Sequence, residues 1–193
     1  MKVSVLNTHH YLKMPWKNGQ GYTLQLACSH QTADFFDWRI SIADVEQDSA
    51  FSFFEGKARA ISILKGHGLI LQNQNSQHEV QLKQNDVYCF SGEEPIYSKL
   101  INGAIQDFNL IYNPQKYTAQ MQWLNQVPYL HSDISAKFIF LYNSASFDLN
   151  VQVEDKQFTL QPHHLLKIED LDCSHFKVTA ETQELSFYLI QLT

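Results

Sequence analysis

The 193-residue sequence is poor in cysteine, and its three cysteines stand far apart at Cys28, Cys89 and Cys173. Their number is odd and no C-x-x-C pair occurs, which argues against a disulfide framework and against a zinc ribbon. We expect buried free thiols, the usual state of isolated cysteines in a folded domain.

Charge is also scarce, and it has the wrong sign for nucleic acid. Charged residues make up 18% of the chain and the net charge is −6, whereas a protein that binds phosphate backbones needs a basic surface. No apolar run approaches the roughly 20 residues of a membrane span, and the first residues contain no signal-peptide core. The sequence therefore predicts a cytoplasmic protein without nucleic-acid or membrane partners.

The common signatures of catalysis are missing. The chain contains no G-x-S-x-G elbow, no P-loop and no G-x-G-x-x-G loop. No catalytic residue and no cofactor are predicted. Whether the protein is an enzyme stays open at this stage, with the negative answer favoured.

What the sequence does contain is a succession of short runs that alternate with a period of two between turn residues, which is typical of β-strands. Helical turns are expected only at 34–37 and 114–122. The strand spacing favours a single compact all-β sandwich or barrel over βα units. The less regular stretch 113–133 predicts a junction between two halves, 1–113 and 114–193. Strands are expected at 22–28, 38–45, 58–64, 69–72, 79–82, 86–90, 96–101, 104–112, 137–142, 147–153, 157–160, 165–168, 176–179 and 185–192.

The order of strands and turns between 61 and 95 resembles the core of a cupin barrel, with Gly66-His67-Gly68 as its glycine turn. Many cupins hold a metal, but the ligand positions are wrong here. Anchoring the first cupin motif on Gly66 places Arg59 where a glutamate ligand would stand, and a cation repels a divalent ion. Anchoring the second motif on Pro95 places Leu100 where a histidine would stand. We therefore expect no metal.

Arginine is rare, and both arginines, Arg39 and Arg59, lie in predicted strands. Alternation places Arg39 and Ser41 on one face of their strand, and Asp107 and Asn109 on one face of theirs. On alternation alone, an outward solvated stripe is favoured. The alternative is a polar lumen that these groups line.

Six blocks of the sequence together resemble the HutD/Ves family. They are W-K-N-G-Q-G-Y-T (16–23), D-W-R-I-S-I-A-D-V (37–45), F-S-F-F-E-G-K-A-R (51–59), L-K-G-H-G-L (64–69), F-S-G-E-E-P (90–95) and D-F-N-L (107–110). The resemblance implies a cupin-type jelly roll, a double β-barrel with two cupin halves in one chain. The chain departs from the family pattern at Gln20 and Glu55, and after Leu110, where the basic residues often found in the family are absent. The ligand-binding residues expected from the matching positions are Trp16, Asn18, Gly19, Arg39, Ser41, Ser52, Arg59, Asp107 and Asn109.

The resemblance implies a metal-free protein that binds a small carboxylate metabolite, with a regulatory role in histidine catabolism or a related stress response. Urocanate, histidine or formylglutamate would fit that context. Arg39 would pair with the carboxylate, Asp107 and Asn109 would orient the polar end, and Trp16 and Asn18 would provide an aromatic wall and a hydrogen bond. One alternative is a metal-independent isomerase or hydrolase with Asp107 or Asp44 as general base. Another is a protein-interaction module. A homodimer stays open.

Overall fold

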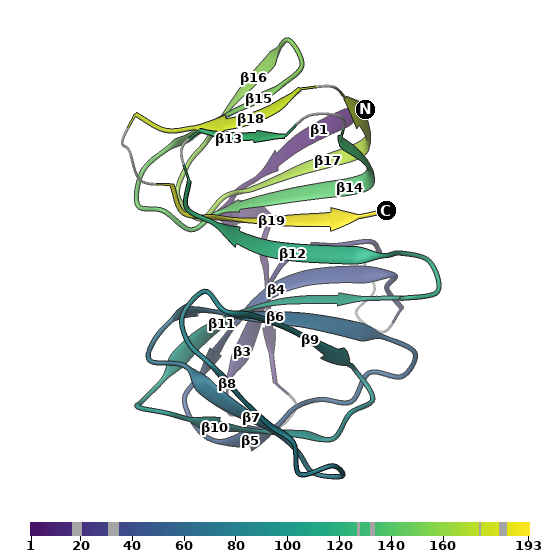
Figure 1. Cartoon of the computed structure of the whole chain (residues 1–193), viewed down its shortest axis with the longest axis vertical. Coiled ribbons are helices and arrows are strands. Elements are labelled where there is room, and N and C mark those ends of the chain that lie inside the picture. Colours follow the sequence, from purple (N-terminus) through teal and green to yellow (C-terminus); the bar gives the residue numbers. More distant parts are fainter. Residues whose placement is uncertain (17–20, 31–34, 127, 132–133, 174, 182–184) are drawn as a thin grey trace. The chain divides into compact units, whose positions relative to one another are not determined.

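The computed structural model describes residues 1–193 except 17–20, 31–34, 127, 132–133, 174 and 182–184 (Figure 1). The chain folds into an N-terminal unit, Tyr11–Lys116, and a C-terminal unit that joins Met1–His10 to Tyr117–Thr193. Within the described ranges the regular structure is β-strand, apart from a short 3-10 helix, η1 (Thr8–His10). The all-β prediction is confirmed. No helix in these ranges is long and apolar enough to cross a membrane.

The N-terminal unit consists of a six-stranded and a four-stranded sheet, whose neighbouring strands all pair antiparallel. In order across the larger sheet, the strands are β2 (Leu12–Pro15), β3 (Tyr22–Cys28), β4 (Trp38–Val45), β11 (Ile105–Tyr112), β6 (Ala58–Lys65) and β9 (Val87–Ser91). Those of the smaller sheet are β5 (Ser49–Ala50), β10 (Ile96–Leu100), β7 (Leu69–Asn73) and β8 (Glu79–Leu82).

The C-terminal unit has the same organisation, with a five-stranded and a four-stranded antiparallel sheet (Figure 1). The larger sheet contains β1 (Lys2–Leu6), β17 (Leu165–Cys173), β14 (Ile134–Asn143), β19 (Phe187–Leu192) and β12 (Ala119–Leu124). The smaller contains β13 (Tyr129–His131), β18 (Phe176–Thr179), β15 (Leu149–Val153) and β16 (Lys156–Leu160).

Three details of the predicted architecture need correction. Each half is a sandwich of two sheets and not a closed barrel, because edge strands such as β2 and β9 have a hydrogen-bonded neighbour on one side only. The first ten residues do not belong to the first half, because β1 pairs along its whole length with β17. The helical turn expected at 114–122 is also wrong in its second part, since β12 begins at Ala119 and pairs with β19.

The interiors of the two units differ in chemistry. The core of the C-terminal unit is a cluster of aliphatic and aromatic side chains that includes Ile139, Leu141, Leu166 and Phe176. The core of the N-terminal unit contains Ile61, Ile63, Leu71 and Phe90, but polar side chains extend the same sheet face. The candidate site lies on that polar part.

A glycine turn fixes the connection from β6 to β7, as predicted. Gly68 has a backbone φ of +107°, and a Cβ atom there would clash with the carbonyl oxygen of Leu82. Only glycine combines this φ with so close an approach of another backbone.

Candidate anion-binding site

The register of three neighbouring strands brings the predicted polar residues onto one face of the larger sheet. Ile111 of β11 lies opposite Arg39 of β4 on one side and opposite Arg59 of β6 on the other. Two residues further along β11, Asn109 lies opposite Ser41. Because directly opposed residues share a face and alternate residues return to it, the two arginines, Ser41, Asn109 and Asp107 all face the same way.

This face points into the unit. Arg59 is 7% exposed, Ser41, Asp107 and Asn109 are 5% exposed or less, and Arg39 is half-buried. The interpretation as a solvated outward stripe is therefore wrong, because the same face of the sheet carries Ile61 and Phe90, which belong to the buried apolar cluster of this unit. The alternative, an interior surface shared by Arg39, Ser41, Asp107 and Asn109, is confirmed, and Arg59 joins it, whereas the role of these residues in binding a ligand stays a prediction.

A chain of hydrogen bonds links Arg59 to Asp107. Arg59 Nη2 donates to Asn109 Oδ1 at 2.8 Å, and Asn109 Nδ2 donates to Asp107 Oδ1 at 2.6 Å. The backbone N–H of Ala43 donates to the same carboxylate oxygen at 3.2 Å. The side chain of Asn109 thus bridges the guanidinium of Arg59 and the carboxylate of Asp107. These two groups form no direct ion pair among the described residues.

Burial shifts the titration of these groups. It raises the pKa of Asp107 to about 7, although the charge of Arg59 and the hydrogen bonds from Ala43 and Asn109 act in the opposite direction. Burial lowers the pKa of Arg59 to about 10, with the like charge of Arg39 adding to this effect and Asp107 opposing it. Burial also lowers the pKa of Arg39. Near neutral pH both guanidinium groups are charged, and Asp107 changes charge.

Phenylalanine rings surround the two guanidinium groups. The Cζ atom of Arg39 lies 4.7 Å from the ring centre of Phe36 and 5.2 Å from that of Phe54. The Cζ atom of Arg59 lies 4.7 Å from the ring centre of Phe51, 5.0 Å from that of Phe90 and 5.7 Å from that of Phe54. These cation–π contacts stabilise the positive charges without satisfying their N–H donors. Phe54 contacts both groups.

Two of those donors lack an acceptor among the residues that the structure describes. The Nε atoms of Arg39 and Arg59 are both buried, and neither has a hydrogen-bond partner in the described part of the chain. Arg39 forms no ion pair there either. Buried donors are almost always satisfied in native proteins, so these two atoms make the cluster a candidate site for an acceptor. The planar fork of a guanidinium is complementary to the two oxygens of a carboxylate.

A pocket of about 530 Å³ opens beside the arginines and has the size of a small-ligand site. Phe36 and Phe54 belong to its lining and also contact the guanidinium groups, Phe36 that of Arg39 and Phe54 those of both arginines. Lys57 adds a positive charge, with its Nζ atom 5.4 Å from the ring centre of Phe36. The lining residues are His30, Phe35, Phe36, Asp37, Phe53, Phe54, Glu55, Lys57 and Lys116.

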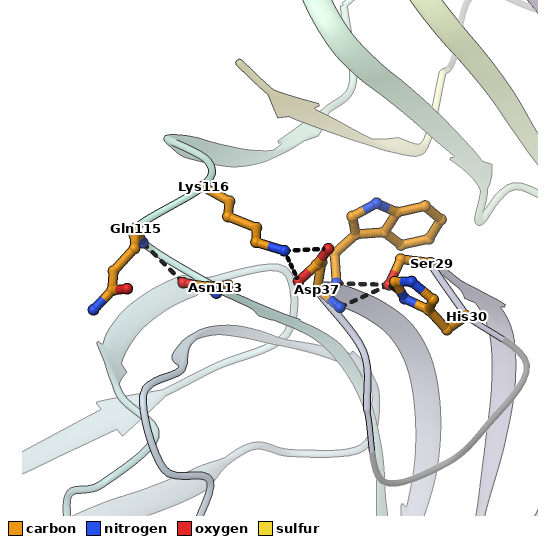
Figure 2. A network of polar contacts seen from close by, with 7 residues as sticks. Ser29, His30, Asp37, Asn113, Gln115 and Lys116 are labelled. Atoms are coloured by element: carbon orange, nitrogen blue, oxygen red, sulfur yellow. Dashed lines mark hydrogen bonds and ion pairs between the residues drawn. The ribbon is translucent and has the colours of Figure 1, made fainter.

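A polar network fixes one wall of this pocket (Figure 2). Lys116 Nζ donates to both carboxylate oxygens of Asp37, at 2.8 and 2.9 Å. The backbone N–H of Asp37 donates to Ser29 Oγ at 2.7 Å, and Ser29 Oγ lies 3.0 Å from His30 Nδ1. Because Asp37 directly precedes β4, this network anchors the strand that carries Arg39.

The other predicted site residues do not join the cluster. Trp16 donates a hydrogen bond from Nε1 to Thr23 Oγ1 at 3.0 Å and packs against the apolar core. These contacts hold the chain beside the start of β3. Ser52 is exposed, and the binding roles expected of Trp16 and Ser52 stay predictions. Asn18 and Gly19 lie outside the described residues. The residues in view contain no group of three or more His, Cys, Asp or Glu side chains able to hold a metal ion, and the expected absence of a metal stays a prediction.

The aromatic residues around the arginines were not predicted from the sequence. Phe36, Phe54 and Phe90 were not among the expected binding residues, nor was Gln25, which is 7% exposed and lies opposite Ser41. The signal in the sequence that could have indicated them is the group of phenylalanines shortly before Arg59, at Phe51, Phe53 and Phe54.

The fold and the site define a cupin-like β-sandwich protein with a buried arginine–carboxylate cluster in one unit. A protein-family model described as HutD matches residues 8–186, and the chain belongs to the HutD family. An uncharacterized 21.2 kDa protein in the hutC 3′ region of Pseudomonas putida is 41% identical over 146 residues, which are 74% of this chain and 75% of that protein. Protein Ves of Escherichia fergusonii is 34% identical over 103 residues, about half of each chain.

Solved structures agree with this assignment. A conserved protein of unknown function from Pseudomonas aeruginosa PAO1 is 31% identical with a TM-score of 0.89, over 100% of this chain and 99% of that chain. HutD from Pseudomonas fluorescens SBW25 is 31% identical with a TM-score of 0.81, over 100% and 98%. YlbA from Escherichia coli has a TM-score of 0.70 over 99% and 90%, and at 8% identity it shows the cupin-like fold alone.

Proposed function

We propose that this protein is a metal-independent receptor for a small carboxylate metabolite, which binds to Arg39 and Arg59 in the N-terminal unit. The observation that carries the proposal is the pair of buried Nε donors without acceptors. The cluster contains two guanidinium groups and one carboxylate, Asp107, which interacts with Arg59, so it keeps a net positive charge while Asp107 is ionised. An anionic ligand would offset that charge and supply the missing acceptors.

The pocket beside Phe36 and Phe54 is the proposed entrance. Arg39 is half-buried, and the ring of Phe54 contacts both guanidinium groups while it lines the pocket. A rotation of this ring would let a carboxylate reach the arginines, with the rest of the ligand lying against the exposed rings of Phe35 and Phe53.

We further propose a regulatory role in histidine catabolism, in the cytoplasm. The name of the Pseudomonas putida relative refers to hutC, and a structural neighbour is named HutD. Urocanate, histidine and formylglutamate all carry the carboxylate that the site requires. Binding without turnover would make the protein a sensor of such a metabolite.

A thermal-shift screen on the purified protein tests this proposal. The probes are urocanate, histidine, formylglutamate and propionate, with propionamide as the matched control that lacks a carboxylate, each with EDTA and with added Zn²⁺, Mn²⁺ or Fe²⁺. A ligand at 100 times its Kd adds about 2.7 kcal/mol of apparent stability. We expect stabilisation by carboxylates in EDTA and none by propionamide. Stabilisation only with a metal ion, or by none of the acids, would contradict the proposal.

The raised pKa of Asp107 favours a second candidate function, a metal-independent enzyme with this residue as general acid or base. A carboxyl group that titrates near pH 7 is suited to proton transfer. Incubation of each pathway acid with the protein, followed by NMR, would show turnover that Asp107→Asn abolishes. Binding without turnover would leave the receptor as the function.

A further inference from the structure

A buried acceptor without a donor faces the same interior surface as the two arginines. Gln25 is 7% exposed, and its Oε1 atom has no hydrogen-bond partner among the residues that the structure describes. Like the arginine Nε atoms, it lies where water is largely excluded, so the missing partner calls for an explanation. The chemistry is opposite, however, because an amide oxygen accepts a hydrogen bond and cannot serve a carboxylate.

The strand register places this acceptor beside the proposed carboxylate site. Gln25 of β3 lies opposite Ser41 of β4, one same-face position along from Arg39. A register shift between Gln25 and Ala27 lets Cys28 lie opposite Arg39, so that β3 presents both Gln25 and Cys28 to this face. Same-face neighbours on adjacent strands are about 7 Å apart along the diagonal. A ligand of a few carbon atoms spans that separation with a hydrogen bond at each end.

We infer that Gln25 is a specificity-determining residue, and that the ligand belongs to the carboxylates that carry an O–H or N–H donor close to the carboxylate group. Arg39 and Arg59 bind the oxygens, and Gln25 Oε1 accepts the ligand's own hydrogen. A carboxylate without such a donor would leave the amide oxygen unpaired, which is how sites built for a hydroxyl or amine reject analogues that lack it. This inference rests on the proposed carboxylate site, and it adds a hydrogen-bond donor as the second functional group of the ligand.

Two probes of matched shape test it, because lactate is propionate with one added hydroxyl. We expect the intact protein at pH 7 to bind one enantiomer of lactate about fivefold more tightly than propionate by calorimetry. Fivefold corresponds to a hydrogen bond of about 1 kcal/mol. In Gln25→Met, which keeps the length of the side chain and removes the acceptor, the preference should vanish, because lactate loses its hydrogen bond and propionate no longer leaves an amide oxygen unpaired. Gln25→Glu keeps an acceptor and should retain the preference for lactate, although its negative charge lowers the affinity for both acids.

Gln157→Met is the matched control, because it makes the same exchange at an exposed position of β16 in the other unit. It should preserve both affinities. An equal affinity of the intact protein for lactate and propionate, or an unchanged preference in a folded Gln25→Met protein, would overturn the inference and leave Gln25 as a water-bound core residue. Failure of propionate itself to bind would instead refute the carboxylate site on which the inference rests.

Discussion

Replacement of Arg39 separates binding from folding more cleanly than any other change in this site. The Arg39 side chain is half-buried, and among the described residues it makes ring contacts but no hydrogen bond or ion pair. Arg39→Ala therefore leaves no acceptor unpaired in the folded protein, and we expect the melting temperature to change little. Carboxylate binding should weaken greatly, because the Arg39 guanidinium is proposed to bind the carboxylate oxygens of the ligand.

The size of the effect follows from the strength of a charge-assisted hydrogen bond, about 1.5–3 kcal/mol. At about 1.4 kcal/mol for each factor of ten, Arg39→Ala should weaken carboxylate binding roughly ten- to a hundredfold. Arg39→Lys keeps the charge but loses the planar fork, so its affinity for the carboxylate should lie between those of the intact protein and of Arg39→Ala.

Calorimetry at constant pH and ionic strength measures the affinities, and circular dichroism confirms folding. Lys156→Ala is the control, because it removes one positive charge at an exposed position of the C-terminal unit and should leave binding intact. An unchanged Kd in a folded Arg39→Ala protein would refute the reasoning and remove Arg39 from the site.

Three further changes test other parts of the account. Because burial holds the pKa of Asp107 at about 7, above the value of a free carboxyl, the folded protein keeps a proton that the unfolded chain has lost, so stability should fall as the pH rises from about 4 to 7. Carboxylate affinity should fall as the pH rises from 6 to 8, since ionised Asp107 offsets the arginines, and titrations of Asp107→Asn should lack both dependences. Gly68→Ala should lower the free energy of unfolding in urea by more than the roughly 1 kcal/mol expected for Gly56→Ala, which also has a positive φ but faces open space; equal losses would contradict the turn argument. Asn143→Leu removes three hydrogen bonds of a fully buried side chain to the backbone and should cost about 3 kcal/mol in the same assay, whereas a loss under 1 kcal/mol would count against that network.

Much of the fold was predictable because its strands alternate. The expected strands 22–28, 38–45 and 79–82 have the observed bounds, since each is flanked by turn residues and has the period of a sheet. Strands such as β1 and β12 were missed because their identity depends on distant partners, β17 and β19, which local pattern does not reveal.

The arginines, Ser41, Asp107 and Asn109 were predictable from the sequence, but their orientation and the surrounding phenylalanines and Gln25 were not. Alternation placed Arg39 with Ser41 and Asp107 with Asn109, and the register confirms that these pairs share a face. It could not decide whether that face pointed to water, because the answer depends on the packing of Ile61 and Phe90 from other strands. Nor could it find the orphaned atoms of Gln25, Arg39 and Arg59, since a missing hydrogen bond is a property of the folded structure.

The most direct test of the carboxylate site uses the fact that Arg39 and Arg59 are the only arginines in the chain. A ¹⁵N-labelled protein should give two arginine Nε–H signals, which Arg39→Lys assigns. Titration with a carboxylate that binds by calorimetry should shift both signals downfield, with the same Kd as the heat of binding, as the orphaned donors acquire acceptors. Saturable binding that leaves both Nε–H signals unmoved would contradict the account, because the ligand would then lie elsewhere.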